Sequence, residues 1–145
     1  MTTIDTFIPY SNYGQAASES QTFGINTLFL DGPDVVTESE PLASTCSGAV
    51  IPALTVMEWV AVGTGVTVAG LQPAVSGSGN ALKGVLTAAY DGTVSTLKVA
   101  PIFRTGKFNK AALVWDASFT TDALKYAAFE PSSALFLGEI TQPSV

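Results

Sequence analysis

The chain has 145 residues, a mass of 15.0 kDa and 47% hydrophobic residues, but only 12% charged residues, a composition that predicts one folded domain and excludes a disordered chain. It contains no histidine and a single cysteine, Cys46, which excludes a Ser-His-Asp triad, a Cys-His dyad, a histidine-ligated metal and an intrachain disulfide. The net charge of −6, with all six basic residues at position 83 or later, argues against binding to nucleic acid or to an anionic membrane surface.

Residues 1–22 are polar and small, with a few aromatic residues among them, Phe7, Tyr10 and Tyr13. We predict a flexible N-terminal arm here and a β-rich domain over residues 23–145. The composition leaves open whether the aromatic residues dock onto a partner or lie on the arm's own domain. The first residues lack a basic stretch followed by an apolar run, so we expect no signal peptide, and a lone cysteine fits a reducing cytoplasm or a particle assembled there.

The first half of the domain reads as short strands separated by turns. Residues 25–30 are a candidate strand that a turn at 31–34 closes, and the acidic stretch 35–47 reads as a loop. Residues 54–62 predict a buried strand, because they are apolar on both faces except for Glu58. Residues 63–80 are rich in Gly, Ser and Thr and predict short strands with loops.

A hairpin is the best local signal. Residues 84–90 and 93–99 favour strands, and Asp91-Gly92 between them is typical of a two-residue turn that requires a positive φ. The second strand continues through 101–103, where Pro101 lacks a backbone N–H and therefore predicts an edge or a bulge.

Helix signals come late in the chain. Asn109 can cap a short turn over 110–115, and Thr120 or Thr121 can cap a helix over 122–129. Asp122 favours the first turn of that helix, Pro131 ends it, and residues 135–140 predict a last strand. The fold class is therefore α+β and mainly β: a small β-rich single domain with one or two short helices and a flexible N-terminal arm.

No pattern of catalytic residues is present. Gly63, Gly65 and Gly70 lack the spacing of a dinucleotide-binding loop. The acidic loop at 31–40 could hold Ca²⁺, but it lacks EF-hand spacing, and a solvated loop is the default interpretation. The uncharged window 59–82 could suggest a membrane span, but its glycines and Pro73 favour buried strands. We therefore predict a protein that is not an enzyme, with no cofactor and no metal.

Two segments carry a resemblance to a known family. The opening ten residues, Met1 to Tyr10, are similar to the N-terminal arm of the lambda-type phage head decoration proteins. The second segment is similar to the C-terminal half of that family in order and approximate spacing: Gly84-Val85-Leu86, Asp91, Ser95-Thr96-Leu97, Gly106-x-Phe108 and Leu113-Val114-Trp115. Together the two segments cover a little over half of the chain, and residues 24–82 match only loosely.

The resemblance implies a capsid decoration and cementing protein. It implies a homotrimer on the outer surface of the expanded virion head, bound at local three-fold sites to the major capsid protein and stabilising the shell against DNA pressure, with assembly in the host cytoplasm. It also implies an arm that orders by adding a strand to a capsid-protein sheet. The arm residues that suit this role are Thr3, Thr6, Phe7, Ile8 and Tyr10, with Pro9 limiting pairing on one edge.

Two large aromatic residues, Phe108 and Trp115, fall within the second matching segment. We expect Phe108 and Trp115 in the core or at the trimer interface, because large aromatic residues are enriched in both places. The alternative function from another class is a phage tail or spike module, or a β-rich domain that binds a host surface.

Overall fold

The structure is a computed structural model that describes residues 28–30, 35–95 and 98–139. Among these residues most regular elements are strands, joined by one α-helix and two short 3₁₀ helices, which confirms the expected mainly-β class. The predicted arm, residues 1–22, lies outside the described residues. In chain order the elements are β1 (Thr37–Pro41), η1 (Ser44–Cys46), β2 (Val50–Ile51), β3 (Val56–Val60), β4 (Gly70–Pro73), β5 (Leu82–Leu86), β6 (Tyr90–Asp91), β7 (Val99–Phe103), β8 (Gly106–Asn109), η2 (Lys110–Ala112), α2 (Asp122–Phe129) and β9 (Leu135–Gly138).

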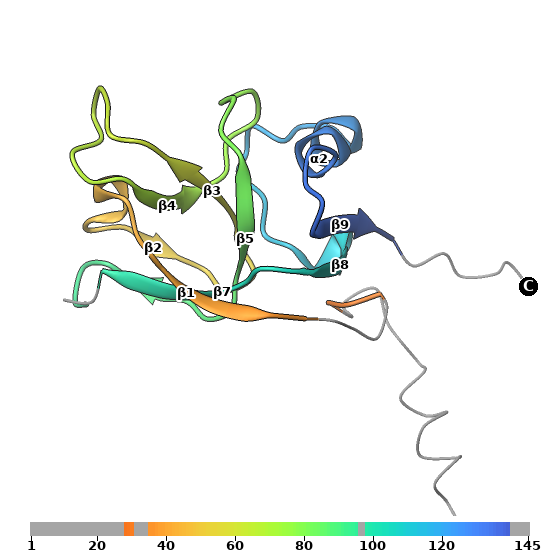
Figure 1. The fold of residues 1–145 in the computed structure, drawn as a ribbon, viewed down its shortest axis with the longest axis horizontal. Coiled ribbons are helices and arrows are strands. Elements are labelled where there is room, and N and C mark those ends of the chain that lie inside the picture. Colours follow the sequence, from red (N-terminus) through yellow and green to blue (C-terminus); the bar gives the residue numbers. More distant parts are fainter. Residues whose placement is uncertain (1–27, 31–34, 96–97, 140–145) are drawn as a thin grey trace, which may run out of the picture.

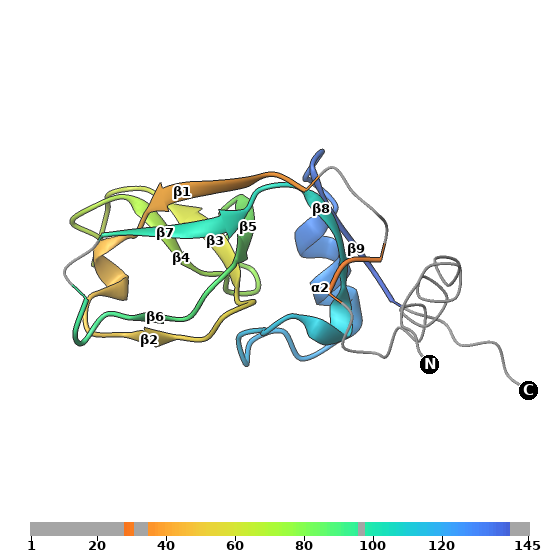
Figure 2. The ribbon, with the colours of Figure 1, turned by 90° about the horizontal axis from the view of Figure 1, so that it is seen from below.

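Five of the strands form one antiparallel sheet in the order β1-β7-β5-β3-β4. Just after β1, Leu42 forms a parallel bridge with Leu71 of β4, so the two outer strands approach each other and the sheet curls. Two smaller pairs accompany this sheet, β2 with β6 and β8 with β9. Figure 2 shows β2 and β6 as a layer facing the sheet, while α2, β8 and β9 form one end of the molecule.

Strand β3 separates two hydrophobic cores, as its apolar pattern on both faces predicts. Met57 belongs to the core that the sheet shares with β2, β6 and η1, together with Leu71, Leu86 and Ile102. Its neighbour Val56 points the other way, into a core closed by the α2, β8 and β9 end (Figure 1). Successive side chains of a strand point to opposite faces, so one strand supplies both cores.

The acidic stretch 35–47 is not simply a loop, and that expectation was wrong. Residues Thr37–Pro41 form β1, which pairs along its whole length with β7. Glu38 forms an ion pair with Arg104 at 2.9 Å, and four of the five β1 residues are exposed. Charged side chains are common on outer strands, where they oppose pairing with other chains.

The predicted hairpin at Asp91-Gly92 is also wrong, although a turn is present there. β5 pairs with β3 and β7, while the short β6 pairs with β2. Asp91 accepts a hydrogen bond from the Thr93 N–H at 2.9 Å, which stabilises the turn locally. Gly92 does not have a positive φ; a Cβ there would lie 2.6 Å from the Cys46 carbonyl oxygen. Glycine is needed at this position for close packing of two chain segments.

We expect Gly92→Ala to destabilise the domain by about 1–3 kcal/mol, because the added methyl group forces the Cys46–Ala49 backbone to move. Urea unfolding at fixed protein concentration measures the change. Gly63→Ala is the matched control, since no atom lies within 4 Å of a Cβ at that position, and its effect should stay within about 0.5 kcal/mol. Equal effects of the two substitutions would contradict the packing explanation.

Pro101 lies within β7, between two neighbouring strands, so it is not on an outer strand of the sheet. It is tolerated because β5 pairs with β7 only through Val85 and Leu86, and the chain beyond them donates the Thr87 N–H to the Pro101 carbonyl at 3.0 Å. Pro101 therefore stands at the end of the β5–β7 ladder, where its missing donor costs little.

The late helix signals are confirmed. The Asn109 side chain accepts a hydrogen bond from the Ala111 N–H at 3.1 Å at the start of η2. The Thr121 hydroxyl accepts one from the Leu124 N–H at 3.3 Å at the start of α2, which spans Asp122–Phe129 as expected. The last strand, β9, pairs in parallel with β8.

Candidate functional site

Both ends of the described chain meet on the small sheet beside α2. Phe29 forms an antiparallel bridge with Phe108 of β8. The Leu30 N–H donates to the Lys107 carbonyl at 2.9 Å, and the Asn109 N–H donates to the Leu28 carbonyl at 2.7 Å. Residues 28–30 therefore lie along one edge of β8, while β9 lies along the other (Figure 1). The part of the predicted strand 25–30 that the structure describes takes this position.

An aromatic cluster holds this end of the molecule together. Phe108 is fully buried, with its ring centroid 5.3 Å from that of Phe29 and 6.5 Å from that of Phe129. Trp115 is half-buried, with its ring centroid 5.1 Å from that of Phe119, and its indole N–H donates to the Lys110 carbonyl at 3.1 Å. The structure thus places Phe108 inside the core and Trp115 at its margin.

Lys110 of η2 forms ion pairs with a residue of α2 and with a residue that follows β9. Its Nζ lies 2.5 Å from Asp122 Oδ2 on α2 and 3.5 Å from Glu139 Oε1, which follows β9. It also lies 5.4 Å from the ring centroid of Tyr126. The hydrogen bond between the two side chains raises the pKa of Lys110 and lowers the pKa of Asp122.

We expect Asp122→Asn to lower the melting temperature at neutral pH, with a difference from wild type that disappears in acid. A carboxyl group with a lowered folded-state pKa stabilises the fold above its unfolded pKa, and this contribution is lost as the pH falls through the folded pKa. Thermal unfolding between pH 7 and pH 2 measures it. Glu130→Gln is the control, since Glu130 is exposed and forms no ion pair with any described residue. A difference that is constant over this range would contradict the ion-pair explanation.

A shallow groove runs between α2 and β9, with a volume of about 400 Å³. Its walls include Tyr126 and Phe129 from the helix and Leu135, Phe136 and Leu137 from the strand. Phe136 is 52% exposed and Tyr126 is 37% exposed. The spacing of the sequence does not reveal these two residues as surface aromatics, because their exposure depends on how α2 packs against β9.

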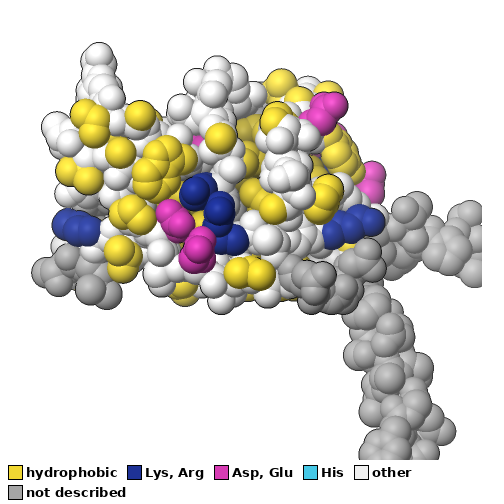
Figure 3. All heavy atoms as spheres, viewed as in Figure 1, with side chains coloured by type: hydrophobic (Ala, Val, Ile, Leu, Met, Phe, Trp, Pro, Cys, Tyr) yellow, Lys and Arg dark blue, Asp and Glu magenta, His cyan; other side chains and the backbone are white. Residues whose placement is uncertain are grey.

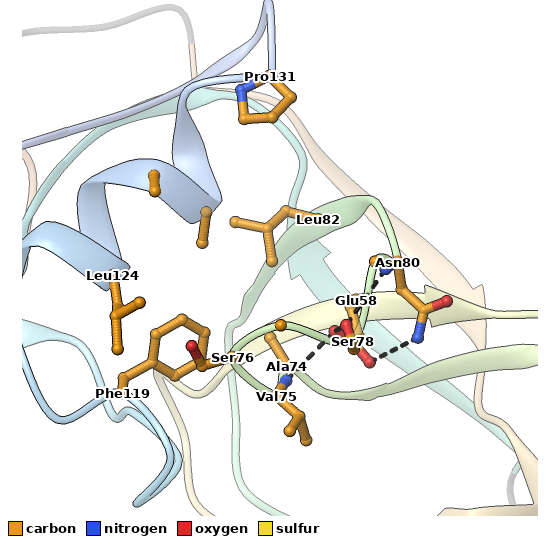
Figure 4. A pocket seen from close by; sticks show the side chains of 14 residues that line it. Glu58, Ala74, Val75, Ser76, Ser78, Asn80, Leu82, Phe119, Leu124 and Pro131 are labelled. Carbon is orange, nitrogen blue, oxygen red and sulfur yellow. Dashed lines mark hydrogen bonds between the residues drawn. The ribbon is translucent and has the colours of Figure 1, made fainter.

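A second hollow, of about 390 Å³, lies between α2 and the loop after β4 (Figure 4). Glu58, on β3, is 1% exposed at its floor. Its Oε1 accepts from Gln72 Nε2 and Asn80 Nδ2, each at 2.9 Å, and its Oε2 accepts from the Ser78 hydroxyl at 2.7 Å and the Val75 N–H at 3.2 Å.

This carboxylate has a structural role that its strand pattern alone did not indicate. All four donors come from residues 72–80, so Glu58 organises the β4–β5 connection. Both carboxylate oxygens are satisfied, and no other titratable side chain lines the hollow. The arrangement supports a folded loop and offers no pair of groups for acid–base catalysis.

The sequence also raised a possible calcium site in the acidic loop at 31–40 and a possible membrane span in the uncharged window 59–82. Within the described residues, no three Cys, Asp or Glu side chains lie close enough together to hold a metal ion. Asp31 and Asp34 of the acidic loop lie outside those residues. None of the helices in the described part of the chain has the length and apolarity that a membrane crossing needs, and the uncharged window contains β4.

A comparison with protein families matches residues 31–137 to the family described as Bacteriophage lambda head decoration protein D. The matched region begins after Leu30, covers every element from β1 to α2, and ends within β9. It spans well over half of the chain and confirms the resemblance that the sequence motifs carry. No curated protein matches the chain.

Proposed function

Because the chain belongs to the family of bacteriophage lambda head decoration protein D, a family of structural capsid proteins, we propose that it cements the phage head as a homotrimer. In this proposal the trimer binds the major capsid protein on the outer surface of the expanded head, at local three-fold sites. It is added to the virion during assembly in the host cytoplasm and holds neighbouring capsomers together against the pressure of packaged DNA.

The position of the chain ends supports a two-part design. Residues 1–22 form the capsid-binding arm, and residues 23–145 form the decoration domain. Residue 28 and residue 139 both lie at the α2, β8 and β9 end, so this end faces the shell (Figure 2). An extended arm of 22 residues spans about 75 Å, several times the radius of about 15 Å expected for a domain of this size. It can reach a neighbouring capsomer.

The arm binds by adding a strand to a sheet of the capsid protein. Main-chain hydrogen bonds supply affinity in such contacts, and alternate side chains set the register. Thr3, Thr6, Phe7, Ile8 and Tyr10 have the β-branched or aromatic side chains that suit a strand. Pro9 donates no hydrogen bond, so it faces the edge of the added strand that stays unpaired.

Three arms on one trimer explain binding to the expanded shell. A single short strand binds at about millimolar strength, near −4 kcal/mol. Once one arm is bound, the other two act at a high effective concentration, and avidity rises by orders of magnitude without new contacts. In an unexpanded shell the three acceptor sites are not spaced for simultaneous binding, so decoration follows expansion.

Co-sedimentation with empty heads tests this function. We expect the purified protein to pellet with expanded heads of its own virus and to stay in the supernatant with unexpanded heads. DNA-filled heads that carry the protein should also release their DNA at a higher temperature than undecorated heads. Absence of binding to expanded heads would overturn the proposal and leave a tail, spike or host-surface module as the function to test.

A further inference from the structure

The chain enters the described structure through residues 28–30, here called the anchor segment. This segment lies antiparallel to β8, on the edge of β8 that β9 does not use (Figure 1). Two backbone hydrogen bonds, of 2.9 and 2.7 Å, join the segment to β8. Hydrogen bonds between antiparallel strands lie perpendicular to the strands, so tension along the segment strains both bonds together. The anchor segment therefore resists a pull along the chain from its N-terminal side.

The Phe29 side chain fixes the anchor segment to the core at the α2 end. Its ring centroid lies 5.1 Å from that of Phe103, in an edge-to-face arrangement, and 5.3 Å from that of the fully buried Phe108. A Cβ at Gly106 would lie 3.2 Å from Phe29 Cε1, so the glycine leaves the space that the ring occupies. Edge-to-face aromatic pairs stabilise a contact beyond the apolar area that they bury. Removal of the Phe29 ring would therefore loosen the segment from the core.

Release of the anchor segment would lengthen the chain outside the domain. Val36 attaches the chain to the domain again, because its carbonyl accepts from the Arg104 N–H at 2.7 Å and its N–H donates to the Thr105 hydroxyl at 3.0 Å. Residues 28–35 would then follow the arm, and eight extended residues span at most about 28 Å. A link with this much slack lets two capsomers move apart before it becomes taut.

We propose that the anchor segment, with Phe29 as its positioning residue, transmits tension between the capsid-bound arm and the decoration domain. The arm then holds capsomers together only while Phe29 stays in the core. The inference rests on the capsid-cementing function proposed above. It separates attachment of the protein to the head, which requires residues 1–22, from retention of packaged DNA, which requires the anchor segment as well.

Hydrogen exchange in the free protein tests whether Phe29 holds the segment. The Leu30 and Asn109 amides donate the two hydrogen bonds between the segment and β8, so in Phe29→Ala we expect both to exchange at least about tenfold faster than in wild type. The control is Trp59→Ala, which removes a partly buried aromatic ring that packs against the other core. It should also lower the melting temperature, but it should accelerate the amides of β3 more than those of Leu30 and Asn109.

DNA-filled heads decorated with each variant separate attachment from retention. Rapid dilution from concentrated salt at room temperature, where each variant is folded, stresses the shell, and the DNA that stays protected from nuclease measures the heads that remain closed. We expect Phe29→Ala to bind expanded heads as tightly as wild type but to protect DNA no better than undecorated heads do. Trp59→Ala should protect DNA as wild type does. Phe29→Leu keeps an apolar side chain without the edge-to-face contact, so it should protect DNA to an intermediate extent.

The outcomes distinguish this inference from the function on which it rests. Heads that carry Phe29→Ala and keep their DNA as wild-type heads do would overturn the inference, and so would Leu30 and Asn109 amides that exchange no faster than in wild type. Failure of Phe29→Ala to bind heads that wild type binds would also overturn it, because attachment would then require the anchor segment. Failure of wild type itself to bind expanded heads would overturn the proposed cementing function.

Discussion

Deletion of residues 2–22 is expected to abolish binding to expanded heads and to leave the trimer intact. In the proposed function the arm supplies the strand that joins the capsid-protein sheet, and the avidity of the proposed trimer depends on three such strands. Every element from β1 to β9 lies after residue 36, so the deletion removes none of them, and we expect the proposed trimer to persist. Co-sedimentation with expanded heads measures binding, and analytical ultracentrifugation measures the trimer.

A smaller change distinguishes the contribution of the arm's side chains to binding from the contribution of its length. Replacing Phe7, Ile8 and Tyr10 with serine keeps the number of residues but removes the side chains that suit a strand. We expect binding to weaken by at least about tenfold, since each bound arm loses part of its affinity and the losses combine. Replacing Ser18 and Ser20 with alanine is the control and should leave binding unchanged. Loss of the trimer on deletion of the arm would contradict the two-part design.

Glu58→Ala is expected to give the largest loss of stability of any single substitution proposed for the domain. It leaves four partly buried hydrogen-bond donors from residues 72–80 without their acceptor, and it removes a side chain that is 1% exposed. An unsatisfied buried donor costs about 1–3 kcal/mol, and these partly buried donors can recover part of this by binding water as the loop relaxes. We therefore expect a loss of roughly 3–5 kcal/mol in urea unfolding at fixed concentration.

Two further variants isolate the cause of that loss. Glu58→Gln keeps the shape of the side chain but replaces one acceptor oxygen with an NH₂ group, so it should cost about 1–2 kcal/mol. Glu130→Ala removes an exposed carboxylate and should change stability by less than about 0.5 kcal/mol. If Glu58→Ala costs no more than Glu130→Ala, the carboxylate does not organise the loop.

Features of the fold that depend on neighbours in sequence are predictable from the chain. The caps at Asn109 and Thr121 and the bounds of α2 follow from local hydrogen bonds, and the structure contains them. The apolar run in β3 predicts burial on both faces because it is a property of one strand. These signals require no knowledge of distant partners.

Pairing between distant segments explains why the predictions for Asp91-Gly92 and for the acidic stretch 35–47 were wrong. Asp91-Gly92 has the composition of a hairpin turn, but β6 pairs with β2 and β5 pairs with β7, so the strands that flank the turn belong to different sheets. The acidic residues of β1 lack a strand pattern. They form a strand because β7 offers backbone hydrogen-bond partners along its free edge. Propensity is a weak guide where tertiary pairing decides.

The sequence predicts some of the candidate functional surfaces and not others. A family resemblance and a polar arm point to capsid binding from the sequence alone. The Tyr126 and Phe136 groove requires the packing of α2 on β9, and the role of Glu58 requires the path of the loop that follows β4. Exposure of an aromatic residue and satisfaction of a buried carboxylate are properties of the assembled fold.

An electron cryomicroscopy reconstruction of expanded heads saturated with the protein tests the capsid-cementing role most directly. We expect three-lobed density at the local three-fold positions of the outer surface, with about one copy of the chain for each capsid-protein subunit. We further expect the α2, β8 and β9 end of each lobe, which lies on the right in the common view of Figures 1 and 3, to face the shell. Heads that carry no such density at saturating protein concentration, or protein found only at the tail, would contradict it.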